Sequence, residues 1–188
     1  MITDIQITHG RIDFNIKNMG IANGLRRAIM NDIEAFAPSH IVMRENMTCQ
    51  TDEYIAHRIA MIPFHLKGNS SGFLTLNVRD RSAFTSDLVG DDFEVATTTI
   101  PIIKMIKGQA LHFDVYFERG SGKDHAKFSH ISRVSYDNKN SHVNMGFETI
   151  TTRPAIQHLR CAIEAMEKNL HRVVYLIESE PEKLLVSQ

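Results

Sequence analysis

The sequence is short of cysteine, of net charge and of long apolar runs, and each shortage argues against a class of protein. Only two cysteines occur among 188 residues, Cys49 and Cys161. Neither has a second cysteine at metal-clip spacing, so a disulfide scaffold and a cysteine zinc finger are both excluded. Basic residues number 21 and acidic residues 22, and this balance argues against non-specific binding of nucleic acid or anionic membrane. No stretch approaches the ~20 apolar residues of a membrane span, and the first residues lack a signal-peptide pattern.

What is present predicts a folded protein. Hydrophobic residues make up 43% of the chain and charged residues 23%, which is enough apolar material for a buried core. The length suits one substantial domain, or two small ones, since domains usually have ~100–200 residues. We expect an intracellular protein, in the nucleus or the cytoplasm, with no membrane anchor.

The two ends of the chain predict strands and helices in alternation. Apolar residues alternate with polar ones from Ile5 to Ile16, which is typical of two half-buried antiparallel strands with a turn at Gly10. From Ile21 to Ile33 the period becomes four, which predicts an amphipathic helix that ends before Pro38. A short strand is expected at 39–43.

The middle of the chain predicts mainly strand and loop. Thr51 is a candidate cap for a short helix that ends at Pro63, and residues 68–72 form a flexible turn. Strict alternation over 74–78 and 111–117 predicts two strands, the second broken at Gly120–Gly122.

The clearest periodicity lies in the last third. Seven apolar residues recur alternately three and four positions apart: Ile156, Leu159, Ile163, Met166, Leu170, Val173 and Ile177. This spacing predicts a long helix, capped by Thr152, with a heptad seam of about three repeats. The seam can pack on a sheet of its own chain or on a helix of a partner, so dimerisation is a candidate function.

The sequence contains only weak signals of a catalytic site. The segment Gly120–His125 resembles a phosphate loop, but Phe117 and Asp124 stand where a Walker loop needs glycine and serine or threonine. Ten histidines include no His-x-x-x-His pair on an expected helix, and the nearest acid–histidine pair is Glu53 with His57. No Gly-x-Ser-x-Gly nucleophile motif occurs. The residues therefore favour a binding or scaffolding protein over an enzyme, with no catalytic residue assigned.

Three segments in order carry a resemblance to a known family. They are Asn23-Gly24-Leu25-Arg26-Arg27, then Asp52-Glu53-Tyr54-Ile55-Ala56-His57-Arg58-Ile59 with Ile62-Pro63, then Gly122-Lys123-Asp124-His125-Ala126-Lys127-Phe128-Ser129. Together with the closing helix they resemble the alpha-like subunits of multisubunit DNA-directed RNA polymerases. That family includes the alpha-like subunit of archaeal polymerases, the third-largest subunit of eukaryotic RNA polymerase II and, more distantly, bacterial alpha. The resemblance extends from Ile5 to about Ile177.

The resemblance implies an α+β fold in two domains. Residues 1–44 and 143–188 would form a discontinuous dimerisation domain, an antiparallel sheet with two long helices, and residues 45–142 an inserted, mainly β domain. The implied function is non-catalytic assembly in transcription. Such a subunit pairs with a smaller alpha-like subunit, and the heterodimer is the platform on which the two largest, catalytic subunits and other small subunits assemble, with little or no direct contact to DNA.

The resemblance also assigns two sets of residues. The dimer interface would use Leu25, Ile29, Ile33, Leu159, Ile163, Met166, Leu170 and Val173. Docking of the large subunits would use Arg26, Arg27, Asp52, Glu53, His57, Arg58, Lys123, His125 and Lys127. The chain departs from its relatives at Tyr54, Phe128 and His130, where phenylalanine, tryptophan and proline are common. It also has no cysteine-rich insertion after Pro63, so neither a metal nor another cofactor is expected.

Alternatives remain open. One is a small nucleotide-binding enzyme that uses the Gly-Ser-Gly-Lys loop, and another is a homodimer that uses the same helical seam. The compact length would suit a streamlined polymerase such as that of a large DNA virus, in which case the protein could be packaged in the virion.

Overall fold

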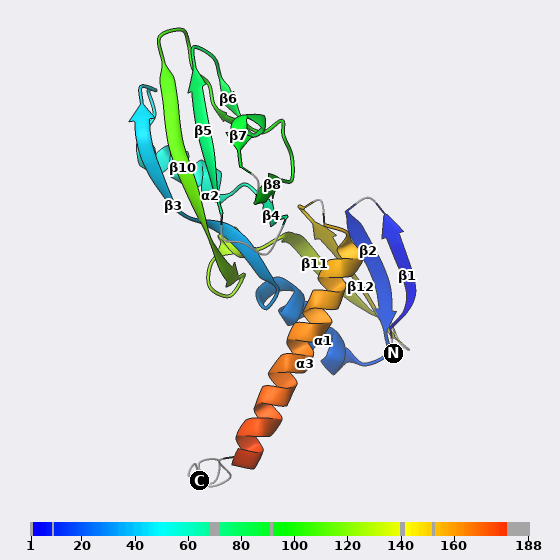
Figure 1. Ribbon diagram of the computed structural model, residues 1–188. Helices are drawn as coiled ribbons and strands as arrows, with labels where there is room; N and C mark the ends of the chain where they lie inside the picture. The colour runs from blue at the N-terminus through cyan, green and yellow to red at the C-terminus, as the bar shows by residue number, and fades with distance from the viewer. Residues whose placement is uncertain are drawn as a thin grey trace. The chain divides into compact units, whose positions relative to one another are not determined.

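The computed structural model of the protein (Figure 1) describes residues 2–8, 10–67, 72–90, 92–139, 142–151 and 153–179. The fold is mixed α and β with antiparallel sheets and few helices, which agrees with the predicted α+β class. The chain separates into two compact units. Unit 1 contains Met1–Ile33, Ile131–Thr149 and Arg153–Gln188, and unit 2 contains Glu34–His130 and Ile150–Thr152. The predicted cap Thr152 and most of the predicted turn at 68–72 lie outside the described residues.

Unit 1 is built on a four-stranded antiparallel sheet. Its strands are β1 (Ile2–Thr8), β2 (Arg11–Ile16), β11 (Ile131–Lys139) and β12 (His142–Thr149), in the order β1-β2-β12-β11. The two predicted opening strands are confirmed, and Gly10 turns between them with a φ of 74°. That angle lies in the left-handed region that glycine adopts without strain. Pairing of β2 with β12 joins the opening and closing parts of the sequence in one sheet.

Two helices cover one face of this sheet. Helix α1 (Met19–Asn31) is capped by Asn18, whose side-chain oxygen accepts a hydrogen bond from the backbone N–H of Ile21 at 3.1 Å. Helix α3 (Ala155–Ser179) packs beside α1. Apolar residues from the sheet and both helices form one core, in which the rings of Phe14 and Phe147 meet edge to face at 6.5 Å.

Unit 2 is built on a second sheet, with strand β10 (Ala110–Ser121) at its centre. The order is β3-β10-β5-β7, where β3 is Glu34–Asn46, β5 is Phe73–Arg79 and β7 is Leu88–Val89. Two small two-stranded sheets pair β4 (Phe64–Leu66) with β8 (Phe93–Val95), and β6 (Ala83–Phe84) with β9 (Pro101–Ile103). Short 3-10 turns occupy Thr85–Asp87 and Ala126–Phe128.

Helix α2 (Asp52–Ala60) belongs to the core of unit 2. Ile55 and Ile59 are fully buried in a cluster with apolar residues of β5 and β10. Thr51 caps the helix as predicted, since its hydroxyl accepts from the Tyr54 N–H at 3.4 Å. Asp52 and Glu53 in the first turn, and His57 and Arg58 in the last, match the helix dipole.

One sequence prediction of where an element ends was wrong and another was confirmed. The predicted short strand at 39–43 is the 13-residue β3, which runs through Pro38. Proline is tolerated there because β3 lies at the edge of its sheet and Pro38 pairs with Phe117 at a register shift. The predicted strand break at Gly120–Gly122 is confirmed, because β10 ends at Ser121. Gly120 leaves room for the Phe128 ring, which an added β-carbon would meet at 2.5 Å.

Candidate interaction surfaces

The second half of helix α3 carries a cluster of exposed apolar side chains in the described part of unit 1. Every residue from 167 to 179 is exposed. Figure 1 shows this half, orange to red, extending beyond α1 and the sheet of unit 1. Six of its side chains are large and apolar, and they are Leu170, Val173, Val174, Tyr175, Leu176 and Ile177. Contiguous exposed apolar surface of this kind is typical of interaction sites.

The first half of α3 is anchored. Ala155, His158, Leu159 and Ala162 are buried, and the helix contacts α1. Gly24 of α1 lies at this contact, where an added β-carbon would lie 3.3 Å from Met166 Cε and the methionine would have to shift slightly. One turn further on, the Asn169 side-chain amide donates to Asp32 Oδ2 at 3.1 Å.

The eight predicted interface residues therefore fall into two groups. Leu25, Ile29, Ile33 and Leu159 are 1–6% exposed and lie in the core of unit 1 itself. Ile163, Leu170 and Val173 are exposed, and Met166 is partly buried against the core. Only the second group offers surface to another chain. The first group holds α1 and α3 in place beneath that surface.

Sequence reasoning missed three residues of the surface, Val174, Tyr175 and Leu176, which are 47–67% exposed. The heptad pattern selects one stripe, and these three lie beside it. The available signal was the unbroken apolar run 173–177 within a predicted helix. A helix that is apolar on every side is normally covered on every side.

Arg26 and Arg27 lie near the middle of α1. The Arg26 guanidinium donates to the Asn23 side chain one turn earlier at 3.0 Å and is half-buried. Arg27 is exposed and makes no hydrogen bond or ion pair with any described residue. Arg27 is therefore available to a carboxylate of another protein.

The predicted docking residues of α2 differ in their contacts. Asp52 accepts a hydrogen bond from the Asn46 side-chain amide at 2.6 Å, and Glu53 and His57 are exposed. Arg58 is tied to strand β9, because its Nε donates to the carbonyl of Ile102 at 2.9 Å and its Nη2 to that of Pro101 at 2.7 Å. Arg58 thus links α2 to β9, whereas Asp52 and Glu53 lie on the surface of the helix.

The loop after β10 is closed by its own side chains. The Asp124 carboxylate accepts hydrogen bonds from the Ser121 N–H at 2.9 Å and the Ser121 hydroxyl at 2.8 Å. These bonds and the nearby Lys123 charge lower the pKa of Asp124 below its ordinary value. The Ser121 N–H that a bound phosphate would need is therefore already bonded to a carboxylate.

The other two predicted docking residues of this loop also have local partners. Lys127 donates from Nζ to the Pro38 carbonyl at 2.8 Å and pairs with Glu118 at 2.7 Å. His125 accepts from the Lys127 N–H at 3.1 Å through Nδ1. Lys127 thus ties the loop to β3 and β10, whereas Lys123 and His125 remain exposed.

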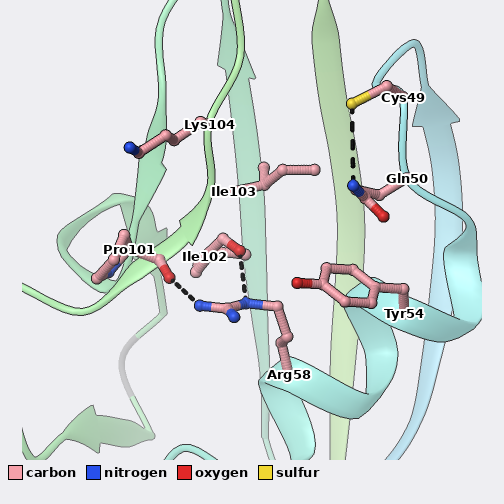
Figure 2. A pocket seen from close by; sticks show the side chains of 8 residues that line it. All are labelled: Cys49, Gln50, Tyr54, Arg58, Pro101, Ile102, Ile103 and Lys104. Atoms are coloured by element: carbon pink, nitrogen blue, oxygen red, sulfur yellow. Dashed lines mark hydrogen bonds between the residues drawn. The ribbon is translucent and has the colours of Figure 1, made fainter.

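A pocket of about 330 Å³ lies between α2, β9 and the loop after β3 (Figure 2). Tyr54 and Arg58 line it from the helix, Cys49 and Gln50 from the loop, and residues 101–104 from β9 and its continuation. Figure 2 shows the Tyr54 hydroxyl directed toward β9, on the same side as the Arg58 guanidinium.

No group of three or more histidine, cysteine, aspartate or glutamate side chains gathers at metal-binding distances among the described residues. None of the helices in the described part of the chain has the length and hydropathy of a transmembrane span.

Comparison with known proteins identifies relatives but no matching family model. The chain is 35% identical over 137 residues to the DNA-directed RNA polymerase subunit Rpo3 of Pyrococcus horikoshii, covering 64% of this chain and 53% of the relative. It is 26% identical over 166 residues to Rpo3 of Methanocaldococcus jannaschii, covering 85% of this chain and 86% of the relative. With Rpo3 of Archaeoglobus fulgidus the identity is 29% over 161 residues, covering 72% of this chain and 61% of the relative. The chain spans about half the length of the Pyrococcus relative. The resemblance to alpha-like polymerase subunits is confirmed.

Proposed function

This chain is a relative of the archaeal RNA polymerase subunit Rpo3, and on that premise we propose that it is a non-catalytic assembly subunit of a DNA-directed RNA polymerase. Unit 1 serves as its dimerisation domain and pairs with a smaller alpha-like subunit. Unit 2 serves as the inserted domain. The heterodimer then provides the platform for the two largest, catalytic subunits.

The observation that carries this proposal is the uncovered second half of α3. Residues 167–179 are all exposed, yet six of them are large and apolar. A helical segment of this length is marginal in water unless tertiary packing supports it. A helix of a second chain that packs along Ile163, Leu170 and Val173 would bury this surface, at about 25 cal/mol per Å² of apolar area.

A partner helix is the occupant that the spacing favours. Leu170, Val173 and Ile177 continue the three-and-four spacing of Leu159 and Ile163, which is the seam of helix pairs and bundles. Val174 and Leu176 widen that seam. The widened surface suits contact with two helices of a partner rather than one.

The exposed arginine of α1 supports contact with the large subunits. A guanidinium is planar and makes bidentate bonds to carboxylates, so Arg27 can bind an acidic residue without reorganising its own unit. Further exposed charged or polar groups that can serve the same docking lie in unit 2, and they are Asp52, Glu53 and His57 of α2 and Lys123 and His125 of the loop.

The decisive experiment is co-expression with the alpha-like subunit encoded by the same source. We expect Ile163→Asp to abolish co-purification, because pairing would bury an unpaired carboxylate at a cost of several kcal/mol. The matched control is His171→Asp, which introduces the same acid on an exposed position of the same helix. Normal co-purification of Ile163→Asp would contradict the proposal, and so would a stable homodimer of the chain alone by light scattering.

A second experiment tests the docking role. Arg26→Ala with Arg27→Ala should leave the small heterodimer intact and reduce its capture of the largest subunits. Both quantities are measured in one pull-down, so the heterodimer is the internal control. Unchanged capture would remove these arginines from the docking surface.

A further inference from the structure

The pocket of unit 2 combines an apolar floor with a cationic rim. Ile102 and Ile103 at its base are 1% and 7% exposed. The charged residues that line it are Arg58 and Lys104, both cations, and none of its described lining residues is acidic. Its volume of about 330 Å³ lies at the small end of ligand pockets, which favours a single side chain over a large cofactor.

Arg58 is held ready for an anion. Two backbone carbonyls of β9 fix its Nε and Nη2, and its guanidinium carbon lies 5.9 Å from the centre of the Tyr54 ring. Its Nη1 makes no hydrogen bond to any described residue. A guanidinium fixed in this way loses little conformational entropy when it binds a carboxylate.

The apolar surface continues beyond the pocket along α2. Tyr54 and Met61 are seven residues apart, with Arg58 between them, so the three side chains lie along one face of α2 from its first turn to its C-terminal cap. Tyr54 is 45% exposed and Met61 is 54% exposed. A bound segment can therefore place one apolar side chain in the pocket and lie along this face.

We propose that this pocket binds a short acidic segment of a partner protein, with an apolar side chain in the pocket and a neighbouring carboxylate on Arg58 and Lys104. Charge complementarity decides the class of partner, because a basic segment would meet two positive charges. The inference rests on the proposed function as a docking subunit and specifies the chemistry of one of its contacts.

Cys49 provides a direct reporter, because it is exposed, unbridged and lines the pocket. The full chain is treated with N-ethylmaleimide and modification of Cys49 is followed by mass spectrometry, with Cys161 as the internal reference. The probe is the peptide acetyl-Gly-Leu-Asp-Glu-Gly-amide. Two control peptides replace its acids by Asn and Gln, or its leucine by alanine.

We expect the acidic peptide to slow modification of Cys49 saturably and to leave Cys161 unchanged. Loss of a charge-assisted contact should make the Asn/Gln peptide bind roughly tenfold more weakly. Lys104→Gln should weaken protection severalfold. The matched control Lys107→Gln, at an exposed lysine outside the pocket, should not. Arg58→Lys keeps the charge, and its folded state is checked by circular dichroism before its weaker protection is interpreted.

Three outcomes would overturn the inference. They are no protection by the acidic peptide, equal protection by the neutral peptide, and self-association of the chain that Lys104→Gln abolishes, which would identify a second copy as the occupant. Pairing through α3 is measured in a separate assay. Failure of the Ile163→Asp experiment would therefore count against the proposed function, and failure of Cys49 protection against the pocket alone.

Discussion

Helices α2 and α3 differ in how much of their apolar surface is buried within their own unit. The nine residues of α2 bury Ile55 and Ile59 completely, begin at the Thr51 cap and are tied to β9 by Arg58. The 25 residues of α3 bury four side chains, all of them between Ala155 and Ala162. Its remaining turns expose apolar residues on every side.

The difference shows which apolar helix surfaces are buried by the chain itself and which are left exposed. Helix α2 has a cap, charges that match its dipole and a buried apolar face, so each local feature agrees with its packing. The second half of α3 has strong helical spacing and no cover among the described residues of its own unit. A segment in which pattern and packing disagree in this way is a candidate binding site.

The largest expected effects are on stability and test whether both helices are anchored where they are buried. Leu159→Ala in α3 and Ile59→Ala in α2 each remove a side chain that is at most 3% exposed. Each should lower the free energy of unfolding by roughly 2–5 kcal/mol, because a cavity remains in a packed core. Urea unfolding of the chain provides the measurement. A loss below about 1 kcal/mol at Leu159 would show that the first half of α3 is not anchored.

Much of this contrast was visible in the sequence. The spacing from Ile156 to Ile177 predicted the long helix that α3 confirms, and Thr51 with Pro63 predicted α2. The division of α3 into a buried and an exposed half was not predictable. Leu159 and Leu170 are the same residue type in the same seam, and only the extent of α1 and the sheet decides which one is covered.

The candidate sites were predictable to a smaller extent. Arg58 was selected by motif, but its bonds to the carbonyls of Pro101 and Ile102 join residues 43 and 44 positions away. No local pattern contains such a contact. The same holds for Lys127, whose bond to the Pro38 carbonyl spans 89 positions. The closure of the loop by Asp124 was easier to predict, because aspartate side chains in turns commonly bond to nearby backbone groups.

A second prediction concerns Asp114, a buried carboxylate of unit 2, and tests how much its hydrogen bonds stabilise the fold. Asp114 of β10 is 6% exposed and is bonded to the Thr75 hydroxyl at 2.8 Å and to Arg44 Nε at 2.9 Å. Burial raises the pKa of Asp114, but these two partners outweigh it, so the pKa lies below the ordinary value. Asp114→Asn should lower the free energy of unfolding by about 1.5–3 kcal/mol at neutral pH, because a hydrogen-bonded charge is lost.

The same group predicts a pH dependence of known sign. Because the folded-state pKa is depressed, the stabilisation by Asp114 is present above its unfolded pKa of 3.8 and is lost as pH falls through the folded value. Between pH about 7 and about 3, urea unfolding should therefore show a smaller loss of stability for Asp114→Asn than for the unchanged chain. Equal losses would mean that Asp114 is no better paired in the folded state than in the unfolded state.

A third prediction concerns the cap that completes α2. Thr51→Ala removes the hydroxyl that accepts the Tyr54 N–H and should lower the free energy of unfolding by about 1 kcal/mol. Thr51→Ser keeps the hydroxyl and is the matched control. If the Ala and Ser variants unfold at the same urea concentration, the packing of Ile55 and Ile59 holds α2 without its cap.

The smallest expected effect is the one that separates the two halves of α3 most sharply. Leu170 is 56% exposed and is not among the side chains packed on the core of unit 1, so Leu170→Ala should change the free energy of unfolding of the lone chain by no more than about 0.5 kcal/mol. The same change should measurably weaken binding of the alpha-like partner in a titration, because the side chain is buried only in the pair. If the substitution leaves the stability of the lone chain unchanged but weakens partner binding, the side chain must become buried on binding. A loss in the lone chain as large as that of Leu159→Ala would instead place Leu170 in a packed core, and the distinction between the anchored and the uncovered half of α3 would fail.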